Sequence, residues 1–378
     1  MGPPAGDFDP SERPFVLVWE VTQACELACK HCRAEADPER HPDELTTAEG
    51  ERLLDEARRF GEGQLVVLSG GDPLSRDDVL DLVAYGVDRG LQMTMTPSGT
   101  ASLTADRIEA LADAGLRRLA LSIDGGSAAA HDEFRQEQGS FADTVAAARA
   151  ARDAGLPLQI NTTVCAETVD ELPAIRDLVA DLGAVLWSVF FLVPVGRGRV
   201  LDAVDPARAE RVMEWLVSVS DAAPFGVKTT EAPHYRRVAL QARRSPTGER
   251  AASNGGGDSS SRGPPDGVGR RTGITAGNGF AFVSHTGEVF PSGFLPRSAG
   301  NVREDSVVDL YRTAPLFEGL RDPDALAGKC GACEFRYVCG GSRSRAYAAT
   351  GDPLGSDPLC AYVPEGYEGD LPSASVSD

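Results

Sequence analysis

Three cysteines near the start of the chain have the spacing of a metal-cluster site. Cys25, Cys29 and Cys32 form a CxxxCxxC pattern directly after an apolar run that predicts a strand. Thiolates bind iron well, and a four-iron cluster commonly takes four of them. Because only three are present here, one iron would keep an open position that can bind a cofactor or substrate, as catalytic zinc sites do. The alternative is a structural zinc site completed by His31 or His41.

A second group of cysteines lies near the other end of the chain. Cys330, Cys333 and Cys339 form a CxxC pattern followed by five residues and a third cysteine, and Cys360 comes twenty residues later. Four thiolates would complete a [4Fe–4S] cluster with no open iron. A zinc ribbon is the rival interpretation. The remaining cysteine, Cys165, stands alone, and we interpret it as a buried or idle thiol.

The segment between these two groups predicts a parallel α/β fold. Short apolar runs predict strands at 16–21, 64–68, 92–96, 119–123, 158–164 and 186–192. Amphipathic stretches predict helices at 46–60, 77–89, 104–114, 141–154, 171–182 and 206–222, with Thr46 and Thr104 as N-caps. Strand–helix units in series imply right-handed crossovers between parallel strands. Since six units are too few for a closed eight-stranded barrel, we expect an open, partial (β/α)6 barrel.

The same patterns divide the chain into five regions. We expect a flexible N-terminus, a partial barrel, a connector, a small C-terminal unit around the second cysteine group, and an acidic tail, at residues 1–14, 15–222, 223–279, 280–364 and 365–378. Within the connector, residues 245–272 are rich in Gly, Ser, Pro and Arg, and predict a disordered insertion. In the C-terminal unit, residues 280–283 and 288–290 flank Thr286-Gly287 and predict a hairpin.

The composition is acidic and poor in lysine. The formal net charge is −20, and the chain holds only three lysines, Lys30, Lys228 and Lys329. Such a charge repels nucleic acids and anionic membranes, so we expect neither as a partner. No apolar run is long enough to span a bilayer, and the first 14 residues do not resemble a secretory signal, so we expect a cytoplasmic protein. A salt-adapted cytoplasm or a GC-rich genome would each explain the scarcity of lysine.

Polar motifs follow several of the predicted strands. The candidate site residues among them are Gly70, Gly71, Asp72, Pro73, Ser98, Ser122, Arg135 and Asn161. Because the carboxyl ends of parallel strands meet at one edge of a sheet, these residues are expected near the first cysteine group. Each of them taken singly could instead be a turn former or a helix cap.

The CxxxCxxC and Gly-Gly-Asp-Pro motifs together resemble the radical S-adenosylmethionine superfamily over residues 15–194. The resemblance implies that S-adenosylmethionine chelates the open iron and is cleaved reductively to a 5′-deoxyadenosyl radical. It implies that residues 70–73 bind the methionine amino group, with Asp72 in place of the usual Glu. By the same resemblance Ser98, Ser122, Arg135 and Asn161 line the rest of the cofactor, and His31 stands where many members carry an aromatic residue.

The C-terminal region resembles the SPASM/twitch group of that superfamily, which carries auxiliary iron–sulfur clusters. Ser292 stands where that group often has Cys, and Ser342 follows Cys339-Gly340-Gly341. These departures imply one auxiliary [4Fe–4S] cluster, held by the second cysteine group, rather than two.

Further motifs narrow the resemblance. Residues 291–296, 300–303, 310–312 and 339–347 resemble the radical enzymes of alternative haem and haem d₁ biosynthesis. That resemblance implies a porphyrin-type substrate and an electron donor such as ferredoxin or flavodoxin. The reaction that fits best is that of a haem b synthase, the oxidative decarboxylation of two propionates of iron-coproporphyrin III to vinyl groups. Candidate propionate partners are Arg197, Arg199, Arg343 and Arg345, with ordinary surface arginines as the alternative.

Three other functions are compatible with these patterns. A relative of the same subgroup could process decarboxylated sirohaem, and other members mature peptides. A non-enzymatic two-cluster electron carrier is the third alternative, although intact cysteine and Gly-Gly-Asp-Pro motifs disfavour it.

Overall fold

A nine-stranded open sheet forms the centre of the protein. The computed structural model describes residues 8–244 and 273–372, so the predicted insertion at 245–272 and parts of both predicted terminal regions lie outside the described residues. The strands follow the spatial order β7-β6-β5-β4-β3-β2-β1-β8-β9. They span Val16–Thr22, Leu65–Gly70, Gln92–Met95, Arg118–Ser122, Leu158–Val164, Leu186–Phe191, Gly226–Thr230, Phe280–Val283 and Val289–Phe290 for β1 to β9. All neighbours pair in parallel except β8 with β9, which confirms the partial barrel.

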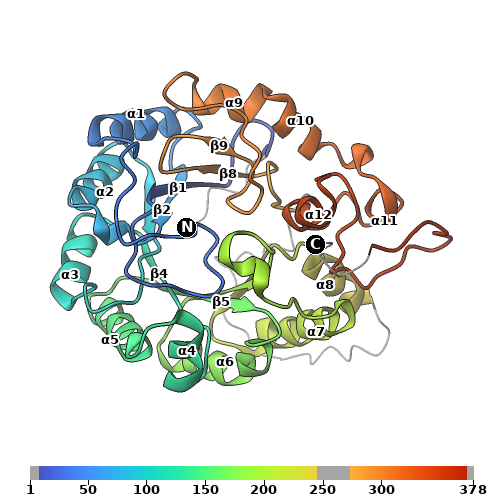
Figure 1. Ribbon diagram of the computed structural model, residues 1–378, viewed down its shortest axis with the longest axis horizontal. Helices are drawn as coiled ribbons and strands as arrows, with labels where there is room; N and C mark the ends of the chain where they lie inside the picture. The colour runs from blue at the N-terminus through green and yellow to red at the C-terminus, as the bar shows by residue number, and fades with distance from the viewer. Residues whose placement is uncertain (1–7, 245–272, 373–378) are drawn as a thin grey trace, which may run out of the picture.

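Helices cover the outer face of this sheet (Figure 1). The barrel helices are α1 to α7, at Thr47–Arg58, Val79–Asp88, Ala105–Asp113, Ala128–Arg135, Ser140–Asp153, Leu172–Asp181 and Pro206–Ala222. The later helices α8 to α12 span Tyr235–Arg244, Val307–Thr313, Pro315–Arg321, Gly328–Gly331 and Arg343–Thr350. Thr46 and Thr104 are confirmed as N-caps, since their side chains accept the backbone N–H of Glu49 and Arg107.

The core lies between the sheet and the helices. Leu17, Trp19 and Val21 alternate along β1 and are fully buried, as are Leu54 of α1 and Leu82 of α2. Each such side chain contributes about 1.5–3 kcal/mol by leaving water. This apolar layer fixes the strands, so that the loops after their carboxyl ends have a rigid base.

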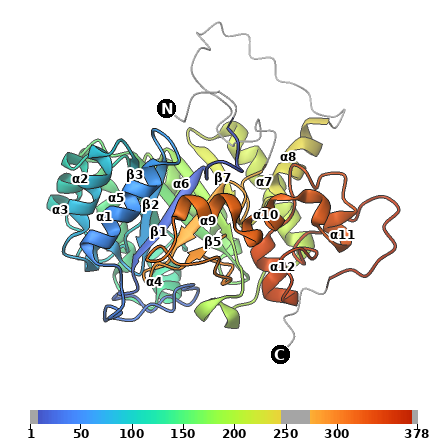
Figure 2. The same cartoon turned by 90° about the horizontal axis from the view of Figure 1, so that it is seen from above.

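The sheet extends beyond the six predicted strands at both edges. β7 pairs with β6, and β8 pairs in parallel with β1, so the hairpin assigned to the C-terminal unit continues the barrel sheet. β7 was not predicted because its sequence, Gly226 to Thr230, contains no apolar run and has a single aliphatic side chain, Val227. The predicted hairpin at β8 and β9 is confirmed. Figure 2 shows α11 and α12 beside the part of the barrel that carries α7 and α8.

Candidate functional site

The first cysteine group lies in the loop after β1, at the carboxyl end of the parallel strands. Cys25 and Cys29 are buried and Cys32 is half-buried; all eight cysteines of the chain fall within the described residues and are free. Backbone N–H groups of Leu27 and Ala36 donate to Sγ of Cys25 and Cys32, both at 3.4 Å. Burial raises the pKa of the Cys25 thiol. N–H donors aimed at sulfur stabilise the thiolate, which is the form that binds iron.

The Gly70-Gly71 turn after β2 packs directly against the cysteine loop. The N–H of Gly71 donates to the carbonyl of Thr22 at 2.9 Å, and the N–H of Asp72 donates to that of Ala24 at 2.6 Å. A Cβ atom at position 71 would lie 2.2 Å from the Ala24 oxygen. Only glycine permits such an approach, so the two loops form one unit.

Asp72 and Ser98 lie together beside Cys25. The buried Asp72 accepts the backbone N–H of Leu74 at 3.1 Å and that of Ser98 at 3.3 Å. Burial raises the pKa of Asp72 to about 6. The Ser98 hydroxyl is 3.2 Å from Sγ of Cys25. A buried carboxylate of this kind is stabilised by an ammonium group that binds next to it.

The other predicted site residues come from β4, β5 and α4. Ser122 and Asn161 are register partners at the carboxyl ends of adjacent strands. The side-chain oxygen of Asn161 accepts from Gln159 at 2.7 Å. Arg135, the last residue of α4, donates to Sγ of Cys29 at 3.6 Å. The structure therefore brings Arg135 to the cysteine loop and places Ser122 and Asn161 at the same edge of the sheet.

Asp124 is a charged residue of this site that was not selected from the sequence. It is buried, forms an ion pair with Arg135, and accepts the N–H of Thr163 at 2.6 Å. The ring of His31, whose Nε2 is 3.9 Å from Asp124, stacks on Phe134 with centroids 4.7 Å apart. Burial lowers the pKa of His31 to about 4, so the ring is neutral near pH 7. The sequence offered no distinctive spacing for Asp124; it showed only an acid two residues after Ser122, at the end of a predicted strand.

Arg197 holds the cysteine loop from the side of β6. Its Nε donates to the carbonyl of Cys29 at 3.0 Å and its Nη1 to that of Ala36 at 2.9 Å. The backbone N–H of Arg197 donates to the carbonyl of Cys32 at 3.0 Å. The guanidinium is thus bound to carbonyls of the protein itself. Arg199, two residues later, is exposed.

Several buried nitrogen atoms around the cysteine loop have no hydrogen-bond partner within residues 8–244 and 273–372. They are Nδ1 of His31, Nε of Arg135 and Nη2 of Arg197. Buried polar groups are almost always paired, and each unpaired one needs an explanation. A polar cofactor bound between the cysteine loop and the strand ends would provide the missing partners, so the residues present fit such a group.

The second cysteine group surrounds a cavity of its own. Cys330, Cys333, Cys339 and Cys360 all line this cavity. N–H groups again point at sulfur, with Phe335, Gly341 and Asp357 donating to Cys333, Cys339 and Cys330, each at 3.4 Å. Burial raises the pKa of Cys360 to about 11. Four thiols with N–H donors around one cavity fit a [4Fe–4S] cluster.

Neither cysteine group converges on one point. In the described part of the chain, no three His, Cys, Asp or Glu side chains are close enough to hold a single metal ion. A four-iron cluster does not need such convergence, because each thiolate binds a different iron atom.

Arg345 joins the C-terminal unit to the mouth of the barrel. It is buried and donates to both carboxylate oxygens of Asp357 at 3.1 Å, to the carbonyl of Leu192 after β6 at 3.0 Å, and to that of Glu231 at 2.7 Å. Burial would raise the pKa of Asp357, but Arg345 and His234 bring it down to about 2. Arg343 is also buried; it donates to three backbone carbonyls and, at 3.5 Å, to Sγ of Cys330. Both arginines are therefore structural and are not surface residues.

Replacing Arg345 with Leu is expected to lower the free energy of unfolding by about 3–5 kcal/mol, because Asp357 would remain as an uncompensated buried charge. Urea denaturation of the metal-free protein measures this change. The matched control is Arg152, an exposed arginine of α5 whose partner is Asp153. Arg152→Leu should lower the free energy of unfolding far less. Equal effects of the two substitutions would contradict the role given to Arg345.

Three serines of the C-terminal region bind one carboxylate, and two of them, Ser292 and Ser342, are the serines singled out from the sequence. Ser292 and Ser344 donate to Glu231 at 3.0 Å and 2.9 Å, and Ser342 donates to its other oxygen. Glu231 directly follows β7 and has a φ of 55°. Hydrogen bonds therefore connect the β7 end, the loop after β9 and the start of α12.

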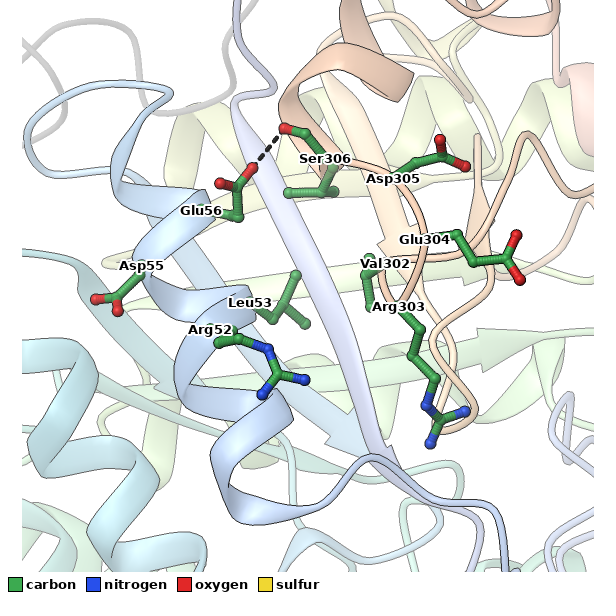
Figure 3. A pocket seen from close by; sticks show the side chains of 10 residues that line it. Arg52, Leu53, Asp55, Glu56, Val302, Arg303, Glu304, Asp305 and Ser306 are labelled. Carbon is green, nitrogen blue, oxygen red and sulfur yellow. Dashed lines mark hydrogen bonds between the residues drawn. The ribbon is translucent and has the colours of Figure 1, made fainter.

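The groove in Figure 3 lies apart from both cysteine groups. It encloses about 330 Å³ between α1 and the loop that leads into α9. Its charged walls include Arg52, Glu56, Arg303 and Asp305, and Ser306 donates to Glu56. No cysteine lines it and it sits in the outer helical layer, so we assign it no part in the chemistry.

The comparisons with known proteins agree with this geometry. The Radical SAM superfamily model matches residues 19–179, which contain the first cysteine group and the strand-end residues. The AdoMet-dependent heme synthase of Methanosarcina barkeri is 41% identical over 93% of this chain and 97% of its own length. That of Nitratidesulfovibrio vulgaris is 38% identical over 92% of each chain. The pre-heme d1 synthase of Dinoroseobacter shibae is 31% identical over 91% of this chain and 85% of its own.

The solved structures support the fold alone. Streptococcus suis SuiB bound to S-adenosylmethionine superimposes with a TM-score of 0.71 at 18% identity, over 93% of this chain and 78% of SuiB. The fold and the first cysteine loop thus define a radical enzyme that uses S-adenosylmethionine and a [4Fe–4S] cluster. More narrowly, the chain belongs to the radical SAM superfamily, in the group that contains the AdoMet-dependent heme synthases. Among the residues described, no helix has the length and apolar character to cross a bilayer.

Proposed function

We propose that this protein is a haem b synthase that decarboxylates two propionates of iron-coproporphyrin III to vinyl groups. The observation that carries the proposal is a second cavity lined by four thiols, joined by Arg345 to the mouth of a radical SAM barrel. An oxidative decarboxylation needs both a radical initiator and an electron acceptor, and the two cysteine groups supply a place for each. The relatives with 38–41% identity, which are named AdoMet-dependent heme synthases, support haem as the product.

In this proposal the cluster of the first site is bound by Cys25, Cys29 and Cys32. S-adenosylmethionine held there would supply the 5′-deoxyadenosyl radical chemistry needed to remove a hydrogen atom from the β-carbon of a propionate. The residues proposed to hold the cofactor are Gly70, Gly71, Asp72, Pro73, Ser98, Ser122, Arg135 and Asn161. Asp72 offers a carboxylate to the amino group, and Arg135 offers a cation close to Cys29.

The second cluster is proposed to be bound by Cys330, Cys333, Cys339 and Cys360 and to receive the electron that decarboxylation releases. The substrate radical R–CH•–CH₂–COO⁻ gives R–CH=CH₂, CO₂ and one electron. We also propose a reducing partner such as ferredoxin or flavodoxin and a cytoplasmic location, where free thiols and clusters persist.

Anaerobic incubation with iron-coproporphyrin III, S-adenosylmethionine and dithionite, followed by mass analysis of the porphyrin, tests the proposal. The expected product has lost two CO₂ and four hydrogens in total, that is, one CO₂ and two hydrogens from each of two propionates. Unchanged porphyrin accompanied by 5′-deoxyadenosine would contradict it. Decarboxylated sirohaem, the alternative substrate that the sequence resemblance implies, would then be the next substrate to try.

The substitution Asp72→Asn is expected to weaken S-adenosylmethionine binding about tenfold or more, because the amide has no charge to offer the ammonium group. Equilibrium binding to the reconstituted protein measures the dissociation constant. Asp77, an exposed carboxylate shortly after Asp72, provides the control, since Asp77→Asn should bind as the unaltered protein does. Unchanged affinity in Asp72→Asn would remove Asp72 from the proposed site.

A further inference from the structure

A buried arginine faces the cavity of the second cysteine group. Arg237 belongs to α8, outside the cysteine-bearing segment, yet its side chain lines the cavity together with all four thiols. The residue is 2% exposed. A cation buried beside four thiol groups needs a reason, since removing it from water is costly.

Its orientation is fixed by three neighbours. Glu210 of α7 accepts from Nη1 and Nη2 at 2.7 Å and 2.5 Å, and Gln241 accepts from Nη1 at 2.7 Å. The ring of Tyr362 lies against the guanidinium, 4.9 Å from its centroid. These contacts hold the terminal nitrogens and leave the Nε edge of the guanidinium uncommitted.

The Nε–H of Arg237 is buried and has no hydrogen-bond partner among the residues that the structure describes. A buried donor without a partner costs about 1–3 kcal/mol, so a partner is expected in the functional protein. Sulfur atoms are the acceptors that this cavity offers. Cys339 and Cys360, with Cys330 and Cys333, line the same cavity as Arg237.

We propose that Arg237 donates an N–H···S hydrogen bond from Nε to the auxiliary cluster and thereby raises its reduction potential. The proposal rests on the proposed function, which places a [4Fe–4S] cluster in this cavity. Reduction adds one negative charge to the cluster, and a fixed positive donor stabilises the reduced form more than the oxidised form. The cluster then takes up the single electron that each decarboxylation releases.

Glu210 sets the size of this effect. Its carboxylate partly neutralises the guanidinium while holding it in place. Removing the arginine and removing the glutamate charge should therefore move the potential in opposite directions. A purely structural role for the pair would not give shifts of opposite sign.

The test uses the full chain with Cys25, Cys29 and Cys32 replaced by alanine, so that the auxiliary cluster alone gives an EPR signal. Redox titration followed by EPR gives its midpoint potential. In this background two variants are compared: Arg237→Lys, and the charge-neutral pair Arg237→Gln/Glu210→Gln. Each should lower the ratio of reduced to oxidised cluster at a fixed potential about tenfold. For one electron this corresponds to a midpoint potential lower by about 59 mV. Glu210→Gln should raise that ratio.

The control is Arg118, which also has a buried, unpartnered Nε but begins β4, at the opposite end of the strands from the cysteine loops. Arg118→Lys should leave the potential unchanged. Full iron content with an unshifted potential in the Arg237 and Glu210 variants would overturn this inference and leave the proposed function standing. No iron in the three-alanine background would remove the auxiliary cluster from the proposed function and overturn the inference with it.

Discussion

Replacing Cys25, Cys29 and Cys32 together with alanine is expected to abolish reductive cleavage of S-adenosylmethionine. Under the proposed function it should also lower bound iron from about eight to about four atoms per chain. These three thiols, the proposed ligands of the first cluster, lie in the loop after β1, where N–H groups of Leu27 and Ala36 point at the sulfurs of Cys25 and Cys32. The second cavity is bounded by its own four cysteines. Iron analysis and quantification of 5′-deoxyadenosine measure the two effects.

Cys165 provides the matched control, because it is fully buried but belongs to neither group. Its sulfur contacts the hydroxyl of Thr168 at 3.5 Å. Cys165→Ala should keep both the iron content and the cleavage activity. If the three-alanine variant kept eight iron atoms, or if Cys165→Ala lost four, the assignment of ligands would be wrong.

Gly71→Ala is expected to reduce S-adenosylmethionine cleavage at least about 100-fold. The added Cβ would lie 2.2 Å from the carbonyl oxygen of Ala24 and 2.5 Å from that of Gln23, so the cysteine loop must move away from the strand ends. A displacement of about 1 Å in a reacting geometry can cost a factor of about 10². Single-turnover formation of 5′-deoxyadenosine by the reconstituted variant measures the loss.

The control for this substitution is Gly319 of α10, where an added Cβ meets nothing within 4 Å. Gly319→Ala should retain full activity and gain slightly in stability, because alanine favours a helix more than glycine does. Activity of Gly71→Ala within a few-fold of the unaltered protein would show that the close approach of the two loops is not required.

The partial barrel was predictable because its signals are local. Apolar runs of strand length alternate with capped amphipathic helices, and each signal lies within one stretch of sequence, as Thr46 and Thr104 illustrate. β7 and the pairing of β8 with β1 were not predictable in this way. β7 is short and polar, and the β8 pairing joins segments separated by more than 200 residues of chain.

The residues of the candidate site likewise fall into those that local motifs identify and those that only the structure reveals. Cys25, Gly71 and Asp72 were selected from local motifs, and the structure places them in one unit. Asp124 was missed because a buried acid at a strand end has no distinctive spacing. Arg345 was considered as a substrate contact, and its ties to Asp357 and Leu192 became visible only in three dimensions.

The sequence by itself determined the two cysteine groups and hence the chemistry that each can support, because ligand spacing within a loop is a local property. Only the tertiary structure decided what surrounds the thiols. It brought Arg135 to Cys29 and turned Arg197 toward the protein's own carbonyls. It also set the guanidinium of Arg237 beside the second cavity. These partners come from distant helices and loops, and the packing of the sheet, rather than any sequence motif, brings them together.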